Sequence, residues 1–245
     1  MTNTAYTQSA TYRRCQALFD AQYPNFQNAG QIYAQWASER IEGTTTVLDV
    51  GCGRDSLAAE AIRKARRSLG VDLVPSDLIH NQLVHWPALA NAYALPFPTA
   101  HVDVITSQWV VEHFPDPQRA FAEMRRVLRP DGSIILLTTN AANYVPRLSR
   151  LVPDSVRDFA LHRLLRRPRH ESHPTFYRAN TRRALEQTAN AAGLVVKRIT
   201  FVGNPFYFAF SLPLFRVALW WERVTDTPRR QHLKLYLIAE LAAAV

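Results

Sequence analysis

Cysteine is scarce in this chain of 245 residues. The two that are present, Cys15 and Cys52, fall in different predicted elements and show neither a metal-ligand spacing nor a CxxC pair. We therefore expect two reduced thiols in a cytoplasmic protein, and no metal site.

Long apolar runs are absent as well. The first seven residues contain no basic region and no apolar core, so no signal peptide is expected. The most apolar stretch, residues 201–221, is interrupted by Asn204, Pro205, Pro213 and Arg216, which argues against a membrane span. There is no internal repeat. With 47% hydrophobic residues, the chain can bury the core of one large domain.

Lysine contributes little to the positive charge. The formal net charge is +9 and the sequence pI is about 10.0, yet the only lysines are Lys64, Lys197 and Lys234. A basic chain raises the question of nucleic-acid binding. Because an excess of arginine over lysine can also follow from genome composition, nucleic acid is not expected to be the main partner.

Short apolar runs alternate with helical patterns through the middle of the chain. The runs predict strands at residues 45–50, 68–72, 89–92, 102–107 and 133–139, with helices at 56–67 and 116–129 and a turn at 130–132. Asp55 or Ser56 is expected to cap the first helix. A further helix at 180–192, capped by Asn180 or Thr181, precedes strands at 194–201 and 233–238. This alternation predicts a parallel sheet covered by helices on both faces.

The strongest local signal is the segment from Val47 to Gly53. A glycine turn between a strand and a helix lets a ligand approach the backbone closely. Asp49 stands two places before this turn, and Asp72 ends the next predicted strand, where its carboxylate can accept both hydroxyls of a ribose. The alternative is an ordinary tight turn with an exposed aspartate nearby.

Five segments resemble, in order and spacing, those of class I S-adenosylmethionine-dependent methyltransferases. They cover roughly residues 45–140, and together they are far more specific than any one alone. They are similar to motif I, the ribose segment, the adenine segment, the fourth strand with its Glu-His tail, and the turn before strand five: residues 49–53, 70–72, 91–97, 102–105 with 112–114, and 125–132.

The resemblance implies a doubly wound, Rossmann-like α/β sheet, mostly parallel with an antiparallel C-terminal edge, and helical lid insertions. It implies S-adenosylmethionine as cofactor and an enzyme that methylates a small-molecule acceptor. The implied cofactor contacts are Asp49, Gly51, Cys52, Gly53, Asp72, Leu73, Asn91, Ala92 and Gln108.

Two positions depart from the family pattern. Asp55 replaces the third glycine of motif I, and Asn91 stands where an acidic residue is expected. A rival interpretation, a nicotinamide dinucleotide fold, requires G-x-G-x-x-G, but Ser56 occupies the third position. A catalytically silent domain that binds the cofactor as a scaffold or sensor is the alternative function.

His113 is the candidate catalytic base, because it follows strand four at the rim where acceptors lie in this fold. A structural role in the strand-four loop is the competing interpretation. His170, His173, Tyr144 and Tyr177 are further candidates, and each also suits a surface or packing role.

We expect a single domain with N-terminal helices (1–44), a cofactor core (45–140), a basic lid (141–178) and a C-terminal part (179–245). The basic run 163–170 and the aromatic stretch 205–222 favour a hydrophobic or lipid-linked acceptor. Residues 138–140 and 173–181 resemble a bacterial subgroup of these methyltransferases that is associated with glycans and lipids, so the resemblance also implies that the acceptor is lipid- or glycan-linked. Arg166, Arg167 and Arg169 would hold an anionic group, and Phe208, Phe210 and Trp220 would line the apolar part. A solvated face, a dimer helix and peripheral membrane contact stay open as alternatives, as do the acceptor atom and the oligomeric state.

Overall fold

The computed structural model describes residues 7, 9–149 and 174–244. The predicted basic run 163–170 and His173 therefore lie outside the described residues. The chain folds into two compact units, which we name by their main content. The sheet unit takes residues 29–140, 175–200 and 236–245, and the helical unit takes 1–28, 141–174 and 201–235.

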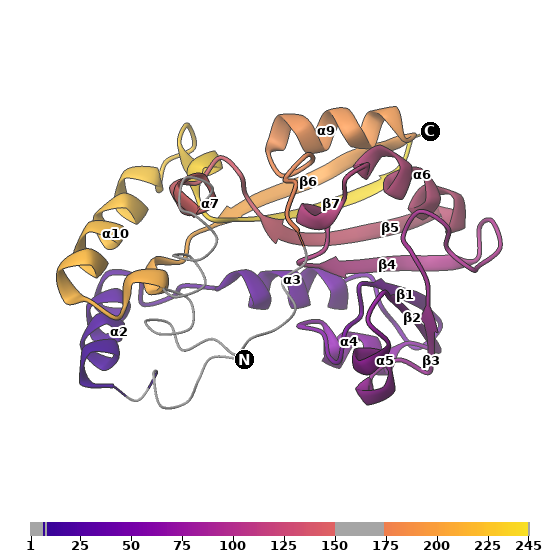
Figure 1. Cartoon of the computed structure of the whole chain (residues 1–245), viewed down its shortest axis with the longest axis horizontal. Helices are drawn as coiled ribbons and strands as arrows, with labels where there is room; N and C mark the ends of the chain where they lie inside the picture. The colour runs from indigo at the N-terminus through magenta and orange to yellow at the C-terminus, as the bar shows by residue number, and fades with distance from the viewer. Residues whose placement is uncertain (1–6, 8, 150–173, 245) are drawn as a thin grey trace. The chain divides into compact units, whose positions relative to one another are not determined.

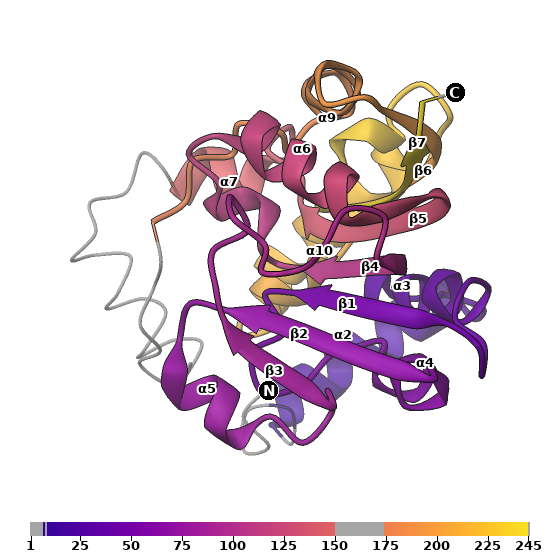
Figure 2. The ribbon, with the colours of Figure 1, turned by 90° about the vertical axis from the view of Figure 1, so that its right-hand side faces the viewer.

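A seven-stranded sheet forms the sheet unit (Figure 2). Its strands are β1 (Thr46–Val50), β2 (Arg67–Asp72), β3 (Trp86–Leu89), β4 (Val102–Gln108), β5 (Leu128–Thr139), β6 (Leu194–Val202) and β7 (Tyr236–Ala243). They follow the order β3-β2-β1-β4-β5-β7-β6. The pairs from β3 to β5 are parallel, whereas β7 runs antiparallel to β5. This confirms the predicted doubly wound sheet with an antiparallel C-terminal edge.

Helices cover both faces of this sheet. They are α3 (Ala29–Ser38), α4 (Ala59–Lys64), α5 (Pro75–His80), α6 (Pro117–Val127) and α9 (Arg182–Ala191), with a short helix η1 (Val111–His113) after β4. Figures 1 and 2 show α3 and α4 on one face and α6 and α9 on the other. Side-chain oxygens of Asp116 and Thr181 cap α6 and α9. The central strands, buried on both faces, account for the continuous apolar runs in the sequence.

Several predicted boundaries were wrong. Helix α4 begins only at Ala59, because the side chains of Asp55 and Ser56 accept N–H groups within the preceding turn, those of Ser56 and Ala58. The predicted turn 130–132 lies within β5, and the third strand ends at Leu89 rather than beginning there. The last strand starts at Tyr236, since the residues just before it form the short helix η3 (Gln231–Leu233).

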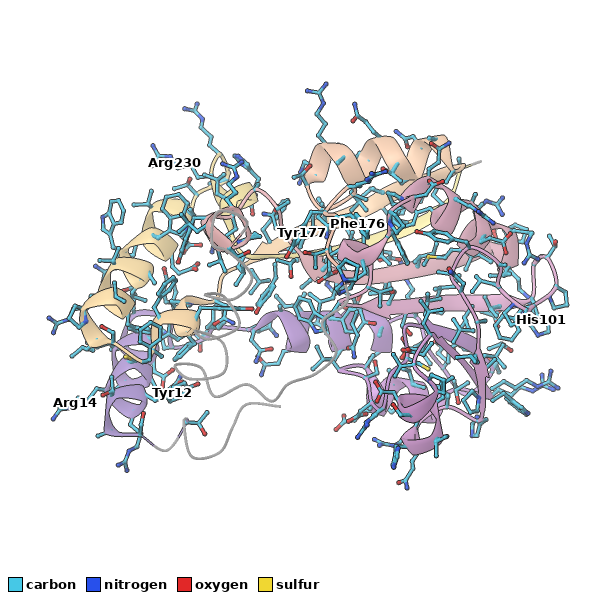
Figure 3. The ribbon with its side chains drawn as sticks, in the orientation of Figure 1. Tyr12, Arg14, His101, Phe176, Tyr177 and Arg230 are labelled. Carbon is cyan, nitrogen blue, oxygen red and sulfur yellow. The ribbon has the colours of Figure 1, made fainter. Side chains whose placement is uncertain are left out.

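The helical unit has its own apolar core. It contains α2 (Ala10–Gln22), α7 (Tyr144–Ser149), η2 (Pro205–Phe208), α10 (Leu212–Thr225) and η3. Cys15, Phe19, Ala209, Phe215 and Leu219 are buried together where α2 meets η2 and α10. Tyr12 of α2, labelled in Figure 3, packs on Phe206 with ring centroids 5.4 Å apart.

Membrane-spanning helices and metal-binding clusters are both absent from the described residues. None of their helices combines the length and hydrophobicity that a membrane crossing requires. No group of His, Cys, Asp and Glu side chains within the same residues could hold a metal ion. Cys15 and Cys52 are both free thiols.

Candidate functional site

The loop after β1 has two glycines in the left-handed backbone region, Gly51 at φ +74° and Gly53 at φ +46°. The N–H groups of Gly51 and Cys52 donate to the carbonyl oxygen of Val71, at 2.8 and 3.1 Å, and fix the loop to β2. A Cβ atom on Gly51 would lie 2.1 Å from Cγ2 of Val110, whereas one on Gly53 would meet nothing within 4 Å. The backbone at Gly53 therefore borders open space that a ligand can occupy.

Asp72, at the end of β2, is joined directly to this loop. Its Oδ2 accepts the N–H of Gly53 at 2.8 Å, and its Oδ1 accepts the N–H of Val74 at 2.9 Å. A carboxylate offers about four lone-pair positions, so each oxygen can accept a further hydrogen bond from a ligand hydroxyl. The half-buried carboxylate thus lies beside the open space at Gly53 with acceptor capacity left over.

Asn81 also braces the loop, a role that the sequence analysis did not predict. Its Nδ2 donates to the carbonyl oxygens of Gly53 at 2.8 Å and Cys52 at 3.3 Å. Its Oδ1 accepts the N–H groups of Leu83 and Val84 at 2.8 and 3.0 Å. An asparagine just after a helix is a common helix-end signal, but its contact with a loop 28 residues earlier exists only in the fold.

Cys52 is a packing residue within the loop. A Cβ atom on Gly70 would lie 2.8 Å from the Cys52 sulfur, so Gly70 makes room for this side chain. Burial, together with the charges of Asp49 and Asp72, raises the pKa of the Cys52 thiol to about 12. The thiol is therefore neutral near pH 7, which argues against a nucleophilic role.

Asp49 is fully buried at the end of β1. Its Oδ1 accepts the hydroxyl of Thr106 at 2.8 Å, while its Oδ2 has no hydrogen-bond partner among the described residues. Burial, reinforced by the negative charges of Asp72 and Asp55, raises the pKa of Asp49 to about 7. The loop thus lies in an acidic environment, although the chain as a whole is basic.

The other predicted cofactor contacts lie at the same edge of the sheet. Gln108, at the end of β4, accepts the N–H of Leu57 at 2.8 Å and donates to the carbonyl oxygen of Asp55 at 3.2 Å, which steadies the turn into α4. Leu73 follows Asp72 and is 59% exposed. Asn91 is exposed, and Ala92 is buried. Because β1 to β4 are parallel, the residues that follow these strands share the carboxyl edge with the glycine loop.

Glu112 holds the loop after β4 in place. Its buried carboxylate accepts the hydroxyl groups of Thr138 at 2.5 Å and Thr139 at 3.3 Å. Burial raises its pKa. Its main-chain oxygen accepts the N–H groups of Phe176 and Tyr177, at 2.7 and 3.2 Å. His113 is therefore anchored through its neighbour, and is itself half-buried at the end of η1.

The remaining catalytic candidates lie in different parts of the chain. Tyr177 adopts a positive φ of +53° in the segment that Glu112 holds. Figure 3 shows Phe176 and Tyr177 well away from His101, the residue that precedes β4. Tyr144 belongs to the helical unit, where it lines an apolar pocket with Phe208 and Trp220. His170 and His173 lie outside the described residues.

Comparison with known proteins agrees with this geometry. Residues 48–136 match the family model described as a methyltransferase domain. An uncharacterized methyltransferase of Mycobacterium sp. (strain KMS) is 39% identical over 108 residues, which are 43% of this chain and 43% of that protein. A demethylmenaquinone methyltransferase of Listeria monocytogenes serotype 4a is 29% identical over 133 residues, 46% of this chain and 54% of that protein.

A solved structure extends the likeness of fold to nearly the whole chain. The geranyl diphosphate C-methyltransferase from Streptomyces coelicolor A3(2) has a TM-score of 0.58 at 16% identity. The superposition covers 99% of this chain and 90% of that chain. At this identity the likeness shows the fold alone.

The matched residues are a class I methyltransferase domain, a family whose cofactor is S-adenosylmethionine. The predicted family and cofactor are thereby confirmed. The antiparallel β7 between β5 and β6 also departs from the strand order of the rival dinucleotide-binding fold. The chain spans about half the length of the curated relatives that it matches.

Proposed function

We propose that this protein transfers a methyl group from S-adenosylmethionine to a small, partly apolar organic acceptor. The observation that carries the proposal is the open backbone at Gly53, hydrogen-bonded to the Asp72 carboxylate. This arrangement suits a nucleoside, because a diol can donate to the carboxylate while the sugar lies against the glycine.

Each part of the loop has a task in this proposal. Asp72 would accept the ribose hydroxyls, and Gly51, Cys52 and Gly53 would leave the backbone accessible. Burial is the main cause of the raised pKa of Asp49, and the negative charges of Asp72 and Asp55 add to it. These negative charges favour a cationic ligand, and the sulfonium of the cofactor is one. We assign further cofactor contacts to Leu73, Asn91, Ala92 and Gln108, which share this edge of the sheet.

The cofactor, when bound, supplies an already activated methyl group. The chain then has to align the acceptor, and alignment alone can supply much of the rate. A hydroxyl acceptor also needs a base near neutral pH, a role that we assign to His113. The hydrogen bonds of Glu112 would fix the position of the short helix that carries this histidine.

The partly apolar acceptor is supported by the pocket in the helical unit, whose lining includes Phe208 and Trp220. Two of the similar proteins are named for demethylmenaquinone and for geranyl diphosphate. Geranyl diphosphate is a molecule with a hydrocarbon chain and an anionic group. We therefore place an apolar portion, and an anionic or polar group, on the acceptor of this protein as well.

Methyl-label transfer tests the proposed function. The full chain is incubated with S-adenosylmethionine carrying a labelled methyl group and with fractionated cell extracts, and the products are identified by mass spectrometry. We expect label in an apolar or amphiphilic small molecule, and much less label with the Asp72→Ala variant when the cofactor concentration is close to the wild-type Kd. Cofactor binding without label in any fraction would favour the catalytically silent scaffold instead.

A further inference from the structure

Helix α10 buries one side and exposes the other. Phe215 and Leu219 lie in the core of the helical unit together with Phe19 of α2. Leu214, Val217 and Trp220 point elsewhere, and their side chains are 45%, 62% and 59% exposed. Three large apolar side chains on one exposed helix face are unusual unless something covers them.

These side chains border a pocket of about 200 Å³ within the helical unit. Its lining is apolar and aromatic, and consists of Tyr144, Phe208, Leu214, Val217, Ala218, Trp220 and Trp221. This volume is below the roughly 300–1,000 Å³ of pockets for drug-sized ligands. The pocket therefore suits a single hydrocarbon chain better than a fused ring system.

The aromatic walls of the pocket are held in place. The ring of Tyr144 stacks on Phe208 with centroids 6.0 Å apart and meets Trp221 edge-on at 5.4 Å. The preceding Asn143 donates to the carbonyl oxygen of Leu233 at 2.8 Å and so anchors the start of α7. Burial, together with the charge of Glu222, raises the pKa of Tyr144 to about 12, which keeps its hydroxyl neutral. The pocket is thus a preformed apolar surface without a charge of its own.

Positive charge lies beside the exposed edge of the pocket. Arg216 and Arg223 stand four residues before and three residues after Trp220, so they flank it on the same side of α10. Both arginines are exposed. Glu222 is the one acidic residue of α10, and it is buried. An anionic group near Trp220 would therefore meet two arginines and no exposed carboxylate of this helix.

We propose that the pocket binds the hydrocarbon chain of an anionic amphiphile, with the head group beside Arg216 and Arg223. A flat membrane surface would also cover the exposed side chains of α10, but it would leave a concave pocket unfilled. The assignment deepens the proposed function by giving the chemical class of the acceptor. The role of the amphiphile as acceptor rests on the proposed function, whereas its binding to the pocket does not. Binding itself is measured without methyl transfer.

The test uses dodecyl phosphate as the probe and the fluorescence of Trp220 and Trp221 as the signal. We expect saturable binding to the full chain. Val217→Asp places a negative charge on the pocket wall at an exposed position, so it should raise Kd about tenfold or more without unfolding the protein. Leu18→Asp is the matched control, because Leu18 is an exposed apolar residue of α2 that does not line the pocket. This control should leave Kd unchanged.

The charge of the head group is tested separately. The double variant Arg216→Gln, Arg223→Gln should weaken dodecyl phosphate binding several-fold and dodecanol binding hardly at all, because dodecanol has no charge for the arginines to attract. The measurement is made at low salt, since salt screens the interaction between exposed charges. Equal effects on the two probes would contradict a role for the arginines in holding the anion.

Three other results would overturn the assignment: no saturable signal, an unaltered Kd in Val217→Asp, or binding only to phosphatidylcholine–phosphatidylglycerol vesicles and not to the monomeric probe. The last would indicate a membrane surface instead. Calorimetry with S-adenosylmethionine on the same samples separates the two proposals. If cofactor binding persists while amphiphile binding fails, only the pocket assignment falls, whereas a loss of cofactor binding alone contradicts the proposed function.

Discussion

Gly51 and Gly53 share a left-handed backbone but meet different surroundings. A side chain on Gly51 would collide with Val110, whereas a side chain on Gly53 would enter open space. Gly51 is therefore required by packing against Val110, and Gly53 by the ligand that we expect beside the loop. The sequence pattern alone, two glycines one residue apart, could not distinguish these roles.

We predict that the two alanine variants differ in how much stability they lose, and that Gly53→Ala affects cofactor binding more than it affects stability. Gly53→Ala should lower the free energy of unfolding by only about 1–2 kcal/mol, the usual cost of the left-handed conformation, but it should abolish measurable cofactor binding. Gly51→Ala should lose a further 1–3 kcal/mol or so, because the new methyl group overpacks against Val110. Urea unfolding and calorimetry measure both quantities. Wild-type affinity in a folded Gly53→Ala variant would contradict the proposed ligand position.

At the scale of elements, the sequence predicts β1, β2, β4 and β5 well, because strands buried on both faces are continuous apolar runs between turn signals. It predicts the start of a helix less well where the side chains that could cap the helix bond to N–H groups of the preceding turn instead. Asp55 and Ser56 resemble N-caps, yet they satisfy N–H groups of the turn, and α4 starts later.

The brace at Asn81 could not be predicted for a different reason. Two of its four side-chain hydrogen bonds join the end of α5 to a loop from an earlier part of the chain, and no local pattern records such a pairing. In the candidate site, the sequence thus identifies the residues that border the ligand space, and it misses a residue that holds them.

Substitution of Asn81 tests this brace. Asn81→Ala removes the donors to the glycine loop and the acceptor for Leu83 and Val84, so it should cost about 1–3 kcal/mol of unfolding free energy and weaken cofactor binding severalfold. Asn81→Asp keeps the acceptor but loses the amide donors, and should recover part of the stability without recovering the affinity. Calorimetry and urea unfolding provide the two readouts. Unchanged affinity in Asn81→Ala would show that the loop needs no brace.

At the scale of the whole molecule, each unit contains a buried carboxyl group with a raised pKa. Asp49 lies in the sheet unit and Glu222 in the helical unit. Burial is the main cause in both, and it raises each pKa to about 7, from ordinary values of 3.8 and 4.5. Since the neutral form is favoured in the fold, each group supports stability fully below its unfolded pKa and loses that support as the pH rises through about 7.

We therefore predict that stability falls between about pH 4 and pH 8 more steeply in the wild type than in two isosteric variants. Asp49→Asn should flatten this dependence for the sheet unit, and Glu222→Gln for the helical unit. Thermal unfolding followed across this pH range is the measurement. Carboxylates paired with arginine, such as Glu39 and Glu123, have lowered pKa values and act in the opposite direction at lower pH. Glu39 and Glu123 are present in the wild type and in both variants, so they cannot cause a difference between them. An identical dependence of stability on pH in the three proteins would contradict the account.

The sheet architecture follows from the sequence, but the role of the aromatic stretch does not. Apolar side chains in a helix have the same composition whether they face a core, a ligand or a membrane. The structure divides α10 between two of these roles, with Phe215 and Leu219 in a core and Val217 and Trp220 at a pocket. Only the fold assigns each side chain to its environment.

The central claim is that the glycine loop and Asp72 bind S-adenosylmethionine, and calorimetric titration of the full chain with this cofactor tests it most directly. We expect one site with a micromolar Kd, about −8 kcal/mol. Asp72→Ala should lose about 1.5–3 kcal/mol, since it removes hydrogen bonds to a charged acceptor. No binding to the folded wild type, or tighter binding of NAD than of S-adenosylmethionine, would contradict the account.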